Sequence, residues 1–245
     1  MKTAREFFQA GKLSEAVQAL NVELRNDPTD VQRRTFLFEL LCFAGEYERA
    51  EKHLAILAEG NKQADMGALL YRAALHAERA RHETFEKRDF PAGAGQTAVS
   101  GTLNGQPFET LLDGDPRVGP RLEVYAAGSY LWIPFQHIES IEMQPPKRLR
   151  DMLWAPALVR TGPAFKMTDL GEVLLPVLCP FSSRHADDSV RLGRATVWEE
   201  VEDQAVPFGQ KILLADDEEI PFLEVRKIEF AQAQSAEPEA AEGAA

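Results

Sequence analysis

The chain has 245 residues, with 27 Lys and Arg residues against 39 Asp and Glu residues, and a formal net charge of -12. This acidic balance disfavours nucleic-acid and anionic-membrane partners, because both require a basic surface that meets phosphates. No stretch approaches the roughly 18 apolar residues of a membrane span, and residues 1–10 hold no signal-peptide core, so we expect a cytoplasmic protein.

Apolar residues near the start of the chain recur at intervals of three and four, which is typical of one buried helical face. They are Phe7, Phe8, Leu13, Ala16, Val17, Leu20 and Leu24. Gly11 interrupts the run and predicts a reversal between two short helices. The dipeptide Asp27-Pro28 is expected to close this pair and open the next helix, since Asp accepts from free helix N–H groups and Pro tolerates the first turn.

The next segment repeats this pattern. Residues 10–16 (AGKLSEA) align with residues 44–50 (AGEYERA), and Leu20 aligns with Leu54, every match being offset by 34 residues. This is the period of tetratricopeptide (TPR) repeats. A further helix is expected over about Asp65 to Lys87, where it would end the array. The sequence therefore predicts a TPR-like helical domain over residues 1–90.

Beyond residue 90 the composition changes to small residues, which predicts a linker over 91–100. Short segments of strand character follow, separated by Gly- and Asp-containing turns. They are Thr102–Leu103, Arg121–Tyr125, Tyr130–Ile133, Ile141–Met143, Ala157–Thr161, Val173–Val177, Ala195–Val201, Lys211–Leu214 and Leu223–Phe230, with a short helix at Arg148–Leu153. Short strands joined by tight turns favour an antiparallel sheet over parallel βαβ units.

The predicted fold class is thus α+β, with TPR-like helical hairpins followed by a compact, mainly antiparallel β-rich domain over residues 101–230. Residues 231–245 are rich in Ala, Gln and Glu and have little to bury, so we expect them to form a disordered acidic tail.

Catalytic motifs are absent from the sequence. It contains no Gly-x-x-x-x-Gly-Lys, no Gly-x-Ser-x-Gly, no His-Glu-x-x-His and no Cys-x-x-Cys, so we predict neither an enzyme nor a cofactor. The nearest set of metal-ligand residues is Cys179, His185, Asp187 and Asp188. Such a loop cluster is usually solvated, but it keeps a metal-dependent enzyme open as an alternative.

A helical-repeat groove is the strongest functional feature, because such grooves commonly hold a peptide or helix of another protein. Aromatic residues anchor interfaces of this kind, although most of those in the helical part are expected to be core. The candidate partner-binding residues are Phe7, Phe8, Phe36, Phe38, Phe43 and Tyr47, together with Arg148 and Arg150. The two arginines flank the short predicted helix, where they either pair with Asp151 and other acidic neighbours or face a partner.

Several motifs in the second half of the chain form a recognisable pattern. Trp132–Ile141 reads Trp-Ile-Pro-Phe-x-x-Ile-x-x-Ile, and Pro145–Ala157 reads Pro-Pro-x-x-Leu-Arg-Asp-x-Leu-Trp-x-Pro-Ala. Gly101–Gly105, Leu111–Arg117 and Gly171–Pro176 belong to the same pattern. Over about residues 1–230 the chain resembles the ImpE/TagJ family, whose members are accessory components of the bacterial type VI secretion system.

The resemblance implies a non-enzymatic function. It implies that the chain binds the N-terminal helix of the small subunit of the contractile sheath. Some members of the family are also linked to the ClpV-type AAA+ ATPase, which makes this ATPase a second candidate partner. A different class of protein, a general TPR chaperone, would need several basic residues and asparagines on the inner helix faces. The helical part offers only scattered ones such as Arg33, Arg34 and Lys52, so we rank the chaperone low.

Overall fold

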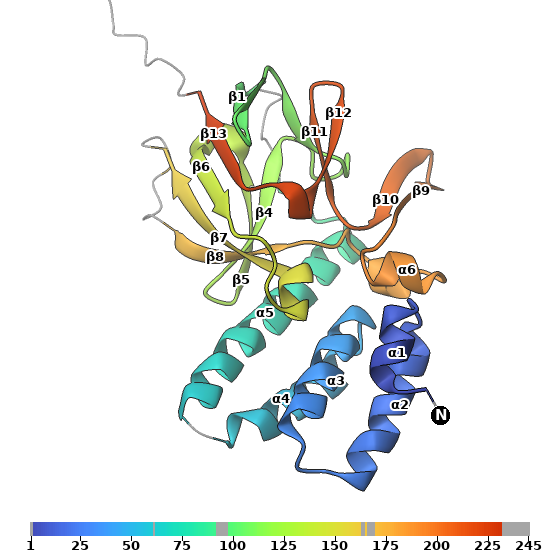
Figure 1. Ribbon diagram of the computed structural model, residues 1–245. Coiled ribbons are helices and arrows are strands. Elements are labelled where there is room, and N and C mark those ends of the chain that lie inside the picture. Colours follow the sequence, from blue (N-terminus) through green and yellow to red (C-terminus); the bar gives the residue numbers. More distant parts are fainter. Residues whose placement is uncertain (1, 61, 92–97, 163–164, 166–169, 232–245) are drawn as a thin grey trace, which may run out of the picture.

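A helical layer and a β-rich layer make up the molecule (Figure 1). The computed structural model describes residues 2–60, 62–91, 98–162, 165 and 170–231. Within them, helices occupy residues 4–87, here called the helical part, and strands occupy residues 101–230, here called the β part. This arrangement confirms the predicted α+β class. Most of the expected linker at 91–100 and nearly all of the expected tail at 231–245 lie outside the described residues, so the proposed domain boundaries stay predictions.

The helical part consists of five consecutive helices. They are α1 (Ala4–Gln9), α2 (Leu13–Asn26), α3 (Val31–Phe43), α4 (Tyr47–Ala58) and α5 (Lys62–Lys87). Gly11 and Gly45 reverse the chain between paired helices with φ angles of +74° and +71°, a region that favours glycine. Ala16 and Ala50 are fully buried, as the 34-residue repeat predicts. None of the described helices is long and apolar enough to cross a bilayer.

Two helix boundaries differ from the prediction. The side chain that caps α3 is that of Asp30, whose carboxylate accepts a hydrogen bond from the Arg33 N–H at 2.9 Å. The expectation that Asp27-Pro28 opens this helix was therefore wrong, because a better-placed carboxylate lies three residues later. Helix α5 starts at Lys62, three residues before the expected position.

The β part contains three antiparallel sheets. The largest has the strand order β2-β1-β13-β6-β7-β8-β4-β5, and smaller sheets have the orders β10-β9 and β12-β11-β3. The strands are β1 (Gly101–Leu103), β2 (Gln106–Phe108), β3 (Leu111–Asp113), β4 (Arg121–Ala126), β5 (Ser129–Pro134), β6 (Ile138–Met143), β7 (Trp154–Thr161), β8 (Gly171–Pro176), β9 (Thr196–Val201), β10 (Gln204–Gly209), β11 (Ile212–Ala215), β12 (Glu218–Pro221) and β13 (Lys227–Phe230).

Short helical turns connect several strands. They are η1 (Phe135–His137), η2 (Leu149–Met152), η3 (Ser182–Arg184), α6 (Asp188–Arg191) and η4 (Phe222–Glu224). The helix expected at Arg148–Leu153 is the 3-10 turn η2. The last expected strand, Leu223–Phe230, is shorter than predicted because its first residues form η4.

One hydrophobic core is shared between the two parts. Buried residues of α2 to α5 pack in one cluster with Tyr125 of β4, Trp154 of β7 and Leu174 of β8. A second cluster lies within the β part. The short helical array thus completes its core with side chains from the sheet, which supplies the apolar cover that two repeats alone lack.

The β part also caps the ends of the first helices. The Asp188 carboxylate accepts hydrogen bonds from the N–H groups of Leu13 at 2.7 Å and Ser14 at 3.3 Å, at the start of α2. The Arg194 guanidinium donates to the carbonyl oxygens of Phe8 at 2.7 Å and Gln9 at 3.1 Å, at the end of α1. These contacts satisfy helix-end groups that have no partner inside a helix.

Replacing Asp188 with Ala is expected to lower the free energy of unfolding by about 1 to 2 kcal/mol, because α2 loses its N-terminal acceptor. Urea unfolding followed by circular dichroism would measure this loss. Glu200→Ala is the matched control, since Glu200 is exposed on β9. Equal stability of the two variants would contradict the capping role.

Candidate protein-binding site

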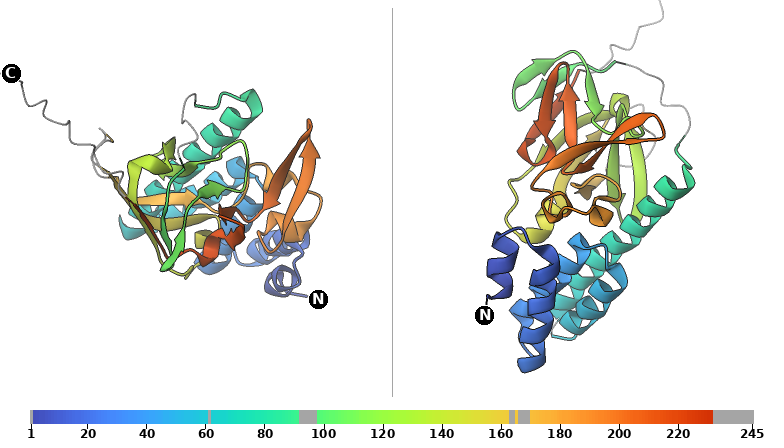
Figure 2. Two further views of the ribbon diagram at one scale, coloured as in Figure 1. Left: turned by 90° about the horizontal axis from the view of Figure 1, so that it is seen from above. Right: turned by 90° about the vertical axis from the view of Figure 1, so that its right-hand side faces the viewer.

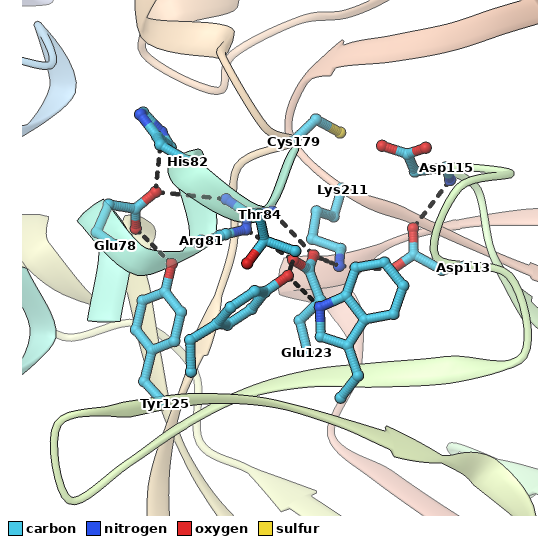
Figure 3. Close-up of polar contacts among 12 residues, drawn as sticks. Glu78, Arg81, His82, Thr84, Asp113, Asp115, Glu123, Tyr125, Cys179 and Lys211 are labelled. Atoms are coloured by element: carbon cyan, nitrogen blue, oxygen red, sulfur yellow. Dashed lines mark hydrogen bonds and ion pairs between the residues drawn. The ribbon is translucent and has the colours of Figure 1, made fainter. Parts of the chain in front are cut away.

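A buried ionic network joins α5 to the sheet (Figure 3). Arg81 of α5 donates from Nε and Nη2 to the two carboxylate oxygens of Glu123 on β4, at 2.7 and 2.8 Å. Lys211, just before β11, places its Nζ 2.5 Å from carboxylate oxygens of both Glu123 and Asp113. These charged side chains are all almost completely buried.

Glu78 forms a second branch of this network. Its carboxylate accepts hydrogen bonds from the Tyr125 hydroxyl at 2.6 Å and the Trp154 indole at 3.0 Å, and lies 3.4 Å from Arg81 and from His82. Burial alone would raise the pKa of Glu78, but the hydrogen bond from His82 and the charge of Arg81 lower it to about 2. Trp154 is therefore a core residue whose indole N–H has a hydrogen-bond acceptor.

The network contains three carboxylates, Glu78, Asp113 and Glu123. The permanent cations that pair with them are Arg81 and Lys211. Burial raises the pKa of Asp113 to about 6, the charge of Lys211 opposes this, and the nearby Glu123 adds to it. Burial also acts on Glu123, but Arg81 and Lys211 outweigh it and hold the pKa of Glu123 far below its ordinary range. Asp113 is thus the carboxyl group that takes up a proton first when the pH falls.

The stability of the chain should therefore depend on the protonation of Asp113. Its folded pKa of about 6 exceeds its ordinary value of 3.8, so the folded state holds the proton more tightly. This contribution is complete below pH 3.8 and is lost as the pH rises through about 6. The unfolding free energy of the original chain minus that of Asp113→Asn should therefore fall as the pH rises from 3.8 to about 6. Urea unfolding at a series of pH values measures it, and a constant difference would contradict the assignment.

Two neighbouring grooves on the helical surface share residues of α3, and a third groove of about 430 Å³ lies beside the first, between α1, α2 and α3. The first, called here the α1–α3 groove, has a volume of about 570 Å³. It is lined by Arg5, Phe8, Gln9, Val31, Gln32, Thr35, Phe36, Glu39 and Leu149. The rings of Phe8 and Phe36 meet edge to face with centroids 5.5 Å apart, so they form a preassembled aromatic wall.

The second groove, called here the α3–α5 groove, has a volume of about 450 Å³ and shares Val31 and Thr35 with the first. Its lining includes Phe38 of α3, Tyr71 of α5, Arg150 of η2 and Arg148 at the start of η2. The turn η2 thus brings the β part to the rim of both grooves. In the right-hand view of Figure 2, the short yellow turn of the β part lies next to the blue helices.

Arg150 links the two grooves. Its guanidinium lies over the Tyr71 ring, 4.6 Å from the centroid, and its Nη1 is 3.4 Å from the Glu39 carboxylate. Burial raises the pKa of Glu39, and Arg150 opposes this rise. The Arg150 Nε is buried and has no hydrogen-bond partner among the described residues. Asp151 instead accepts from the backbone N–H groups of Lys147 and Arg148, both at 2.9 Å, and so stabilises η2.

The predicted partner-binding residues are divided between the two grooves and the core. Phe8 and Phe36 line the α1–α3 groove, and Arg148 and Arg150 line the α3–α5 groove. Phe38 also borders the α3–α5 groove, but it is only 1% exposed and belongs mainly to the core. Phe7 is half-buried and packs against the helical core.

Two others are removed from the candidate set by their positions. Phe43 is fully buried, and Tyr47 borders a small internal cavity beside His82. Sequence reasoning also missed Val31. Its side chain is 64% exposed and lines both grooves.

The residues of the metal-site alternative do not converge. Cys179 is buried, which raises the pKa of its thiol, while His185 contacts Glu199 at 3.0 Å. Asp187 caps α6 and Asp188 caps α2. Across the described part of the chain, no three His, Cys, Asp or Glu residues are grouped to hold a metal ion.

The fold is that of a short TPR-like array carried by an antiparallel sheet. The profile of the family described as ImpE protein matches residues 105–229, just over half of the chain. The type VI secretion system accessory component TagJ of Pseudomonas aeruginosa is 30% identical over 261 residues, covering 93% of this chain and 90% of that protein. The chain therefore belongs to the ImpE family, as the sequence motifs indicated.

A crystal structure supports the fold. Protein VPA1032 from Vibrio parahaemolyticus aligns with a TM-score of 0.83, covering 96% of this chain and 99% of that one, at 20% sequence identity. The arrangement of helices and sheet is therefore preserved at low sequence identity.

Proposed function

We propose that the chain is a non-enzymatic, cytoplasmic accessory protein of the type VI secretion system. In this proposal it binds the N-terminal helix of the contractile sheath's small subunit in the two helical grooves. Its likeness to TagJ, a protein named as an accessory component of that system, supports the first statement. The observation that supports helix binding in the grooves is the exposed Val31, which lies where the two grooves meet.

The shape and chemistry of the grooves fit an amphipathic helix. Such a helix binds through apolar side chains spaced three and four residues apart, and the Phe8–Phe36 wall and Val31 offer apolar contacts to them. The neighbouring volumes of about 570 and 450 Å³ give room beside α3.

The charge of the two grooves is opposite in sign to the net charge of the chain. The two grooves hold three arginines, Arg5, Arg148 and Arg150, but only one carboxylate, Glu39, within a chain of net charge -12. Glu39 is already paired with Arg150. A bound helix should therefore carry acidic residues beside its apolar face, because these would meet the unbalanced positive charge.

Isothermal titration of the full chain tests this proposal. The titrant is a peptide that covers the N-terminal helix of the sheath small subunit encoded in the same genome. We expect a one-to-one complex of micromolar affinity, and no heat from a scrambled peptide of the same composition. A flat trace with the native peptide would refute helix capture. The contact with a ClpV-type ATPase, the second candidate partner, stays a separate prediction, which a titration with that ATPase would test.

A further inference from the structure

One side of α5 carries an apolar stripe that is covered at one end only. Met66, Leu70, Ala73 and Ala77 follow one another at intervals of four, three and four residues, so they lie on one side of the helix. The buried Arg81 continues this row four residues after Ala77. Arg81 and Ala77 are 1% and 0% exposed, whereas Leu70 is 49% and Met66 67% exposed. The neighbouring Leu69 is 66% exposed. The exposure of the side chains in this stripe therefore increases toward the N-terminal end of α5.

The end of the sheet explains this change. The turn between β4 and β5 meets α5 at Ala73, where a Cβ on Gly128 would lie 3.6 Å from the Ala73 Cβ. Beyond this point α5 continues past the sheet, while its other side packs on α4 (Figures 1 and 2). The last helix of a repeat array normally presents a polar outer face to water. Met66, Leu69 and Leu70 break that rule.

Two charged residues identify a suitable occupant. Asp65 and Arg72 lie seven residues apart, about two turns, and so flank Leu69 along the same side of α5. Neither side chain has an ion-pair or hydrogen-bond partner within the part of the chain that the structure describes. If two α5 helices cross antiparallel at Leu69, Asp65 of each meets Arg72 of the other. The surface is thus complementary to itself in charge as well as in hydrophobicity.

We propose that the N-terminal half of α5 pairs with the same segment of a second copy of this chain, in an antiparallel, two-fold symmetric contact. The contact would bury Met66, Leu69 and Leu70 and form two Asp65–Arg72 ion pairs. The α3–α5 groove uses the side of α5 that carries Gly67 and Tyr71. Dimerisation would therefore leave the grooves open, and each dimer would present two of them.

Sedimentation equilibrium of the full chain at concentrations up to about 100 μM tests the dimer. We expect dimers for the original chain and a dimer dissociation constant raised at least about 10-fold by Asp65→Arg or by Arg72→Asp, because each change places like charges together. The double variant Asp65→Arg/Arg72→Asp reverses both charges and should restore the dimer. Leu69→Glu should give monomers, and urea unfolding checks that every variant remains folded.

The groove variant Val31→Glu should stay dimeric, which separates this contact from helix capture. A monomeric original chain would overturn the proposal. Dimers that survive both single charge changes, or a double variant that stays monomeric, would overturn the antiparallel Asp65–Arg72 arrangement. Because no peptide is added, failure of helix capture leaves each of these results unaffected.

Discussion

Replacement of Arg81 by Met is expected to lower the free energy of unfolding by about 3 to 5 kcal/mol, the usual loss when one partner of a buried ion pair is removed. Arg81 is 1% exposed and forms both of its strong hydrogen bonds with Glu123. Met retains much of the aliphatic stem, so the loss reports mainly on the charge. Without Arg81, Glu123 shares Lys211 with Asp113, and Glu78 retains only His82 and neutral donors.

Arg79→Met is the matched control, because Arg79 lies two residues away on the same helix and pairs with Glu51 at the surface. An exposed pair of this kind contributes at most about 1 kcal/mol. Urea unfolding of both variants gives the comparison. The loss for Arg81→Met should also be smaller at pH 5 than at pH 8, since protonation relieves the unpaired carboxylates. Equal losses for the two variants would show that the network is not a major source of stability.

Val31→Glu is expected to weaken binding of the sheath-subunit helix at least about 10-fold, because a desolvated charge in the centre of an interface is costly. The same change should leave the fold intact. Val31 is exposed in the free protein and is the first residue of α3, where a carboxylate interacts favourably with the helix dipole.

Val22→Glu provides the matched control for this measurement. Val22 is 43% exposed on α2 and lines neither groove, so the same substitution there should not change the affinity. Isothermal titration of both variants with the same peptide gives the ratio of dissociation constants. If Val31→Glu binds as tightly as Val22→Glu, the helix does not occupy the junction of the two grooves.

The helical part was largely predictable because its signals are local. The intervals of apolar residues, the 34-residue offset and the glycines at 11 and 45 each act within a few turns of helix. The strands were harder to predict. Four were missed, namely β2, β3, β10 and β12, because they are short, contain Pro or Gly, or carry exposed acidic residues. Their pairing depends on partners far along the chain.

The ionic network could not be predicted for a related reason. Glu78, Asp113, Glu123 and Lys211 stand in unremarkable sequence surroundings and meet only when α5 packs on the sheet. The one sequence signal was Glu123 itself, a charged residue between Leu122 and Val124 at the centre of a predicted strand. In the same way, Asp187 and Asp188 were interpreted as solvated loop residues or metal ligands. Their role as helix caps depends on the position of α6 beside α2.

The long-range caps on α1 and α2 affect how the chain folds during synthesis. Asp188 lies 175 residues beyond Leu13, and Arg194 lies 186 residues beyond Phe8. The first hairpin therefore emerges from the ribosome long before the groups that complete its ends. It must wait for most of the β part to be translated before those ends are secured. The end of the chain that is made first is thus among the last to reach its final stability.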